Sequence, residues 1–166
     1  MDIRRCSRLL TAALFAGALG LAGPPAFAQS GHFIKKGGNA PECTDIGTQV
    51  TCTGKVAGLG GETFEIRIAA EGLAIVECTN PGGNVAPGQA TAVDLAGSTG
   101  PLPTPRNGQF VFSITTDEPE PLPPTPTCPN EMWTADIVDV IFDTATLTLF
   151  EDGVLVDTVV VIVDGF

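Results

Sequence analysis

Hydrophobic and polar residues alternate along most of the chain after residue 28, with the period of two that is typical of β-strands. The clearest cases are residues 62–70 (ETFEIRIAA), 109–115 and 144–150, where apolar side chains share one face. No stretch after residue 28 has a sustained helical period, so the pattern predicts an all-β protein. The residues expected to face its core are Phe64, Ile66, Ile68, Val76, Phe110, Phe112, Ile114, Trp133, Ile137, Leu147 and Leu149.

The run from 131 to 142 changes parity in its middle. Apolar residues occupy odd positions up to Ile137 and even positions from Val138 onward. A β-bulge at Ile137-Val138 would reconcile the two halves, because a bulge inserts one extra residue into a strand. A strand buried on both faces would do so as well, and the sequence leaves both readings open.

Two dipeptides predict turns between strands. Glu71-Gly72 separates residues 62–70 from the apolar run LAIVEC, and Asp152-Gly153 separates two long apolar runs near the end of the chain. Asp-Gly between alternating runs is a strong hairpin signal. Strands with Gly, Pro or Asn between them predict a single antiparallel β-sandwich over residues 42–166, immunoglobulin-like in general architecture.

The N-terminal segment has the pattern of a secretory signal peptide. Arg4, Arg5 and Arg8 precede an apolar run, which ends in the small-residue site Ala26-Phe27-Ala28. We expect residues 1–28 to be removed by cleavage after Ala28, with residues 29–41 forming a flexible leader. The protein is then secreted or held at the cell surface, and no membrane span remains after cleavage.

Four cysteines follow the expected cleavage site: Cys43, Cys52, Cys78 and Cys128. An even number in an exported chain predicts two disulfides, although four cysteines allow three pairings. The placement of Cys43 and Cys52 around a turn at Gly47 favours Cys43–Cys52 and Cys78–Cys128. A zinc site is the alternative, but the chain has no C-x-x-C pair.

Removing the signal peptide makes the chain strongly acidic. Residues 29–166 contain five Lys and Arg and 18 Asp and Glu, a net charge of −13. Such a charge disfavours nucleic acid and anionic lipid as partners, because both require a basic patch. Calcium is the alternative reading of the acidic residues, with Asp143 and Glu151-Asp152 as its candidate ligands, although no loop has the D-x-D-x-D-G pattern.

Few residues have the chemistry of a catalyst. Residues 29–166 contain one histidine, His32, and no tyrosine, and their cysteines are expected to be oxidised. We therefore predict no enzymatic activity and no cofactor. A hydrolase built on paired carboxylates is the remaining alternative, with Glu65, Glu71 and Glu77 as its candidates.

Two irregular segments supply the candidate binding loops. Residues 78–89 read CTNPGGNVAPGQ, and residues 115–129 are rich in proline. A disulfide between Cys78 and Cys128 would hold both at one end of the domain, and rigid loops are common binding sites. The residues expected to contribute are Asn80, Gly82, Gly83, Asn84, Glu118, Glu120 and Asn130.

Three stretches carry a resemblance to a known group of proteins: the region from Cys52 to Gly60, CTNPGGNVAPGQ at 78–89, and the region from Cys128 to Ala135. They resemble small secreted β-proteins, mostly from actinobacteria, that share a CTNPGGNxAPGQ motif and have no assigned activity. The general build also resembles the neocarzinostatin-like carriers of small apolar ligands. These resemblances imply an exported β-sandwich.

The expected function is a secreted, non-catalytic β-sandwich module for extracellular binding or surface structure. Its expected partner is an extracellular protein or a glycan. A small-ligand carrier of the neocarzinostatin type is the alternative, and a secreted hydrolase is the third hypothesis. An apolar cleft between the sheets would indicate a carrier.

Overall fold

The computed structural model describes residues 30–165, so the predicted signal peptide lies outside the described residues. The described part is almost entirely β-strand, as predicted. Its elements are β1 (His32–Phe33), β2 (Glu42–Asp45), β3 (Val50–Ala57), β4 (Thr63–Thr79), β5 (Val85–Pro87), β6 (Thr91–Ser98), β7 (Leu102–Pro103), β8 (Gln109–Thr115), α1 (Pro124–Thr127), β9 (Thr134–Glu151) and β10 (Val154–Asp164).

The strands form one ten-stranded mixed sheet that folds back on itself. The central path is β1-β3-β2-β10-β9-β4-β5, with β6 and β7 on β4 and β8 on β3. β2 and β10 pair in parallel through Cys43 and Val163. The purely antiparallel arrangement predicted from the sequence is therefore wrong at this junction, where the first and last parts of the domain meet.

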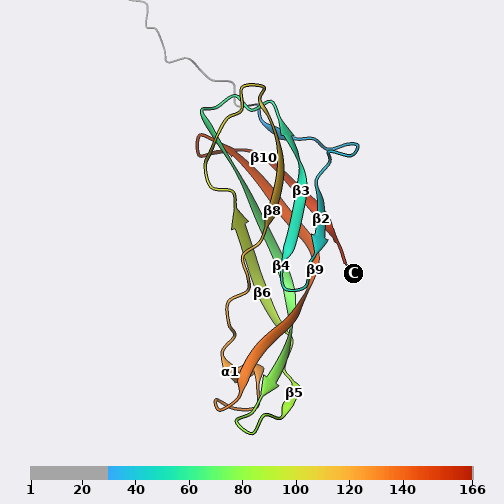
Figure 1. Ribbon diagram of the computed structural model, residues 1–166, viewed down its shortest axis with the longest axis vertical. Coiled ribbons are helices and arrows are strands. Elements are labelled where there is room, and N and C mark those ends of the chain that lie inside the picture. The colour runs from blue at the N-terminus through green and yellow to red at the C-terminus, as the bar shows by residue number, and fades with distance from the viewer. Residues whose placement is uncertain (1–29, 166) are drawn as a thin grey trace, which may run out of the picture.

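β4 and β9 run along nearly the whole length of the molecule (Figure 1). We call the end that carries β5 and α1 the distal end, and the end that carries the β9–β10 turn the proximal end. β8 folds over β4 towards the proximal end, where the rings of Phe64 and Phe110 lie 5.0 Å apart. The distal half of β4 and β9 projects beyond β10 as an arm.

A continuous β4 replaces the predicted turn at Glu71-Gly72. Gly72 lies within the strand. The position requires glycine because a Cβ there would come 2.5 Å from Val140 Cγ1. Glycine thus allows close packing at this position rather than a chain reversal. The second predicted turn is confirmed: Asp152 and Gly153 have φ of 49° and 79° and join β9 to β10.

Of the two readings left open for residues 131–142, the structure shows the β-bulge. Ile75 pairs with Asp139 and Val76 pairs with Ile137, which leaves Val138 as the extra residue. Val138 is 48% exposed, whereas Val140 beyond it is fully buried. The bulge therefore returns the apolar residues of β9 to the core face.

Eight of the predicted core residues are buried. Three of them, Ile66, Leu147 and Leu149, have no exposed surface. Phe110, Trp133 and Ile137 are only partly buried at the margin of the core. The predicted flexible leader is wrong in its middle, because His32–Phe33 forms β1 against β3 and Phe33 is 1% exposed. An apolar side chain in a Gly- and Lys-rich segment was too weak a signal to predict this strand.

Two disulfides are present, with the predicted pairings Cys43–Cys52 and Cys78–Cys128. Cys43 and Cys52 lie directly opposite each other on β2 and β3. Disulfides of this kind are typical of an oxidising, extracellular environment. Among the described residues, no helix is long and apolar enough to cross a membrane.

Candidate functional site

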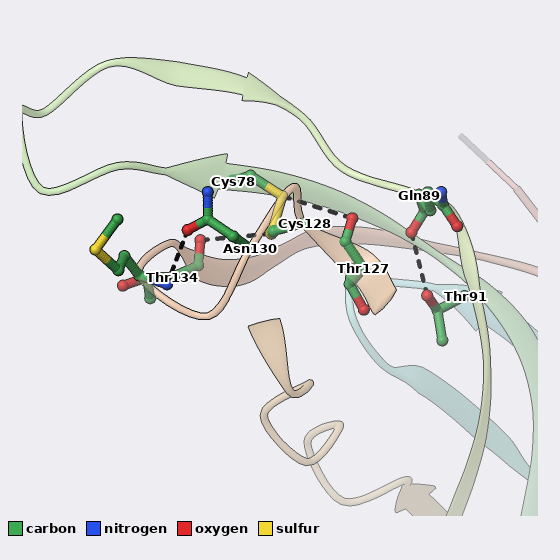
Figure 2. Close-up of a disulfide and its surroundings, with 8 residues drawn as sticks. Cys78, Gln89, Thr91, Thr127, Cys128, Asn130 and Thr134 are labelled. Carbon is green, nitrogen blue, oxygen red and sulfur yellow. Dashed lines mark hydrogen bonds between the residues drawn. A yellow bond between two sulfur atoms is a disulfide. The ribbon is translucent and has the colours of Figure 1, made fainter. Parts of the chain in front are cut away.

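The Cys78–Cys128 disulfide closes the distal end of the molecule (Figure 2). It joins Cys78, near the end of β4, to Cys128, the residue after α1. Beside it, the Gln89 N–H donates to the Thr127 carbonyl at 2.9 Å. A Cβ on Gly88 would lie 3.0 Å from Cys78 Sγ and 3.1 Å from Val76 Cβ. The glycine near the end of CTNPGGNVAPGQ thus lets the backbone pass against the disulfide.

The predicted binding residues around this disulfide are engaged in their own turns. The Asn80 side-chain oxygen accepts from the N–H groups of Gly82 and Asn84, both at 2.9 Å, and Gly83 has a φ of 80°. Asn130 likewise accepts from the Met132 N–H at 3.0 Å. These asparagines order the loops, and a direct contact of theirs with a ligand stays a prediction.

Glu118 and Glu120 lie on the proline-rich segment instead. Glu118 lines a hollow of about 220 Å³ against Asp136 and Ile137 of β9, and Glu120 is exposed on the same segment. The predicted loop residues are therefore divided between the disulfide-closed end and the flank of β9.

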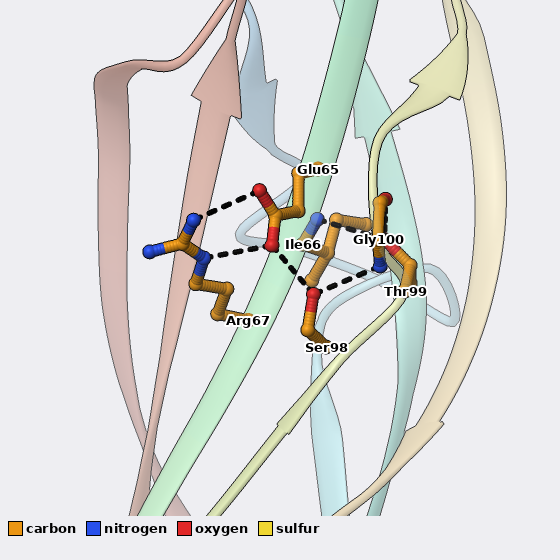
Figure 3. Close-up of polar contacts among 6 residues, drawn as sticks. All are labelled: Glu65, Ile66, Arg67, Ser98, Thr99 and Gly100. Carbon is orange, nitrogen blue, oxygen red and sulfur yellow. Dashed lines mark hydrogen bonds and ion pairs between the residues drawn. The ribbon is translucent and has the colours of Figure 1, made fainter.

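A polar network holds the proximal part of β4 to the β6–β7 connection (Figure 3). The Arg67 guanidinium donates to both carboxylate oxygens of Glu65, at 2.8 and 3.0 Å, and the Ser98 hydroxyl donates to the same carboxylate at 2.6 Å. The hydrogen bond from Arg67, followed by that from Ser98, lowers the pKa of Glu65. Arg67 also lies 4.4 Å from the centre of the Phe150 ring. The Glu65 carboxylate therefore forms a structural ion pair with Arg67.

The two suspected calcium ligands at the β9–β10 turn accept hydrogen bonds from backbone amides. Glu151 is fully buried and accepts from the N–H groups of Gly60 at 2.7 Å and Gly31 at 3.3 Å. Asp152 accepts from the Thr63 N–H at 2.8 Å, and this bond is the main reason that its pKa is lowered. The burial of Glu151 could not be predicted from the sequence, because the neighbouring residues also fit an exposed turn.

A group of exposed apolar side chains lies on the outer face of the distal arm. Even-numbered residues of β4 face the core, yet the odd-numbered Leu73 and Ile75 are apolar and are 45% and 36% exposed. Ile141 lies opposite Leu73 on β9 and is 54% exposed, and Val138 is exposed at the bulge. We call Leu73, Ile75, Val138 and Ile141 the outer patch. Apolar residues on both parities of LAIVEC were the signal that could have revealed it.

Small side chains extend this face into a shallow groove towards the proximal end. Two adjoining hollows of about 440 and 400 Å³ both contact Ala69 of β4 and Thr146 of β9. The first is also lined by Glu71 and Asp94, and the second reaches the Glu65–Arg67 network. The groove arises because alanine and threonine leave the sheet surface low between larger neighbours.

Two pairs of carboxylates flank the outer patch. Glu71 of β4 lies directly opposite Asp94 of β6, and we call these residues the proximal carboxylate pair. Glu77 of β4 lies directly opposite Asp136 of β9, and these form the distal carboxylate pair. All four residues are exposed. The outer face thus presents apolar side chains between two doubly negative ends, and the exposed Asp139 lies opposite Ile75 within this centre.

No group of three or more His, Cys, Asp or Glu side chains within residues 30–165 could hold a metal ion. The acidic side chains are spread over the surface, and a calcium site stays a prediction. In comparisons with protein-family models, with curated proteins and with solved structures, nothing matches this chain. The function must therefore be argued from the geometry of the surface.

Proposed function

We propose that this chain is a secreted, non-catalytic β-sandwich module that binds an extracellular partner through the outer face of its distal arm. In this proposal residues 1–28 direct export and are cleaved after Ala28, and the domain is immunoglobulin-like in general architecture. The observation that carries the proposal is the outer patch, in which Leu73, Ile75, Val138 and Ile141 are exposed side by side on a sheet. Exposed apolar patches of this kind mark interaction sites.

The rigidity of the arm supports the same function. The arm is closed by the Cys78–Cys128 disulfide, and its inner face buries Val76 and Val140. A surface held in one conformation loses little conformational entropy when it binds a partner. The outer patch is therefore built as a pre-ordered contact surface.

The two other hypotheses have less support. A carrier needs an apolar cleft between the sheet layers, whereas Ile66, Leu147 and Leu149 have no exposed surface and fill the region between them. A hydrolase of the paired-carboxylate type needs one carboxyl group kept protonated by its surroundings. Glu65 is ion-paired with Arg67, and Glu71 and Asp94 are both exposed, so these carboxylates lack such an environment.

The proposal can be tested by capture from culture and cell-wall fractions with the oxidised domain, residues 29–166, as bait. The test variant is Ile75→Thr/Ile141→Thr, which keeps β-branched side chains on the strands and removes apolar surface. We expect the wild-type domain to retain a defined partner that the variant does not retain. The partner should then bind the purified domain directly in calorimetric titration.

The matched control is Val111→Thr on β8, because Val111 is 69% exposed but lies away from the outer patch. It should capture the same partner as the wild type. Equal capture by all three proteins would overturn the assignment of the outer patch, as would the absence of any retained partner. Thermal unfolding of each protein confirms that the variants are folded.

A further inference from the structure

Within residues 30–165, positive charge lies outside the distal arm. The cationic side chains after residue 29 are Lys35, Lys36, Lys55, Arg67 and Arg106, with His32 as the one histidine. No Lys, Arg or His follows Arg67 in β4, and none occurs in β5, β6, α1 or β9. The distal arm therefore carries only negative charge.

The carboxylate pairs are unfavourable in the isolated protein. Like charges directly opposite each other on neighbouring strands repel, and both pairs have this arrangement. The ion pairs within residues 30–165 are Lys35–Asp157 and Arg67–Glu65, so no cation of the described residues neutralises either carboxylate pair. Folding thus places the four charges of these pairs, together with the exposed Asp139 opposite Ile75, around the outer patch without compensating for them.

The spacing of the two pairs defines a footprint. Glu71 and Glu77 are six positions apart on one strand, which corresponds to roughly 20 Å at the usual rise per residue. Leu73 and Ile75 lie between them on the same face. The proximal pair also lines the hollow of about 440 Å³ on this face, which leaves room for a side chain of the partner.

From this arrangement we propose that the partner of the outer face is a cationic protein segment with an apolar centre and basic residues at both ends. This inference rests on the proposed function, and it names the chemistry of the partner. Its apolar centre covers the outer patch, and its basic ends contact the proximal and distal carboxylate pairs. Binding thereby removes apolar surface from water and relieves the repulsion within each pair.

The same observations disfavour other occupants. An anionic polymer would be repelled by the four carboxylates. A neutral glycan would leave the repulsion in place, and aromatic side chains suited to stacking on sugars are not part of the outer patch. A second copy of the acidic face would bring eight carboxylates together, so self-association through this surface is electrostatically unfavourable.

The test uses the oxidised domain and a synthetic peptide with two arginines at each end, an apolar centre and a length of about 20 Å, matched to the footprint. A second peptide carries glutamates in place of the arginines. Titration at low salt should show binding of the arginine peptide and none of the glutamate peptide. The affinity should fall as salt is added, because ionic strength screens exposed charges.

Two variants remove the carboxylate pairs, Glu71→Gln/Asp94→Asn and Glu77→Gln/Asp136→Asn. Each should weaken binding roughly three- to tenfold, as expected for two exposed ion pairs. Glu42→Gln/Asp164→Asn is the control, because it changes the net charge equally at exposed positions of β2 and β10, away from both carboxylate pairs. This control should alter the affinity less than about twofold.

A second readout does not depend on a ligand. Removing either carboxylate pair should raise the melting temperature of the free domain while it weakens binding, since the repulsion disappears with the charges. A variant that is destabilised, or a control variant that loses as much affinity as the test variants, would overturn the proposal. If the peptide fails to bind while Ile75→Thr/Ile141→Thr still abolishes partner capture, the cationic partner is wrong and the contact surface stands.

Discussion

Gly72 shows how one residue decides the course of a strand. The sequence predicts a turn at Glu71-Gly72, since glycine commonly ends strands. In the structure Gly72 lies opposite Phe142, and a Cβ would come within 2.8 Å of that ring and 2.5 Å of Val140. The lack of a side chain is needed for packing between β4 and β9, and this need depends on a partner strand about 70 residues away.

Gly72→Ala should therefore destabilise the protein by about 1–3 kcal/mol, because the added methyl group overpacks the core. Urea unfolding of the oxidised protein measures this difference. Gly38→Ala is the control, because no atom lies within 4 Å of the site where its Cβ would be added. A loss of stability in the control equal to that of Gly72→Ala would contradict the explanation.

At the scale of elements, alternation along the chain predicted most strands but not their lengths. Residues 63–70 and the run LAIVEC belong to one strand, β4, and residues 134–142 and 144–150 belong to β9. The bulge at Val138 could be predicted because the parity of apolar residues changes there. The outer patch could not be assigned to a surface until the strand was known to be continuous.

The two disulfides differ in the length of chain that they close. Cys43–Cys52 spans nine positions and Cys78–Cys128 spans 50. In the chain-entropy model these links stabilise the folded state by about 3 and about 4 kcal/mol. All four cysteines are buried, so replacing either pair with alanine removes a similar amount of buried surface.

Cys78→Ala/Cys128→Ala should accordingly lower stability by about 1 kcal/mol more than Cys43→Ala/Cys52→Ala. Thermal and urea unfolding of the two variants measures the difference. Hydrogen exchange should increase in residues 116–130 in the first variant alone, because the disulfide ties this segment to β4. A greater loss from the short link would contradict the model.

At the scale of the whole molecule, the strand order could not be read from the sequence. The local pattern does not record that β2 pairs with β10, or that β4 pairs with β9, because these contacts depend on the fold as a whole. The net charge was evident, whereas the separation of charge between the two ends became visible only with the topology. Asp94 could not be predicted as a site residue from the sequence, because only the register of β4 and β6 places it opposite Glu71.

The ionisation of Glu65 makes the stability of the whole molecule depend on pH. The pKa of Glu65 is lowered from 4.5 by the hydrogen bonds from Arg67 and Ser98. A carboxylate with a lowered pKa stabilises the fold above its unfolded value, and this contribution is lost as the pH falls through the folded value.

Comparison with Glu65→Gln isolates this contribution. The wild type should exceed this variant in free energy of unfolding at neutral pH, and the difference should shrink as the pH falls below about 4.5. Urea unfolding across this range measures it. Glu62→Gln, an exposed position on the preceding turn, is the control and should show no such trend. A difference that stays constant with pH would refute the assigned role of Glu65.

The parallel junction between β2 and β10 has a consequence for the order of folding. Cys43, near the start of the domain, pairs with Val163, and Phe33 before it is buried in the same core. Contacts between residues so far apart in sequence form slowly, because the long intervening chain must first be brought together. The domain therefore cannot be completed while its last strand is still being synthesised. Until β10 has been made, β2 therefore lacks its parallel neighbour and has an unpaired edge, to which another chain could add.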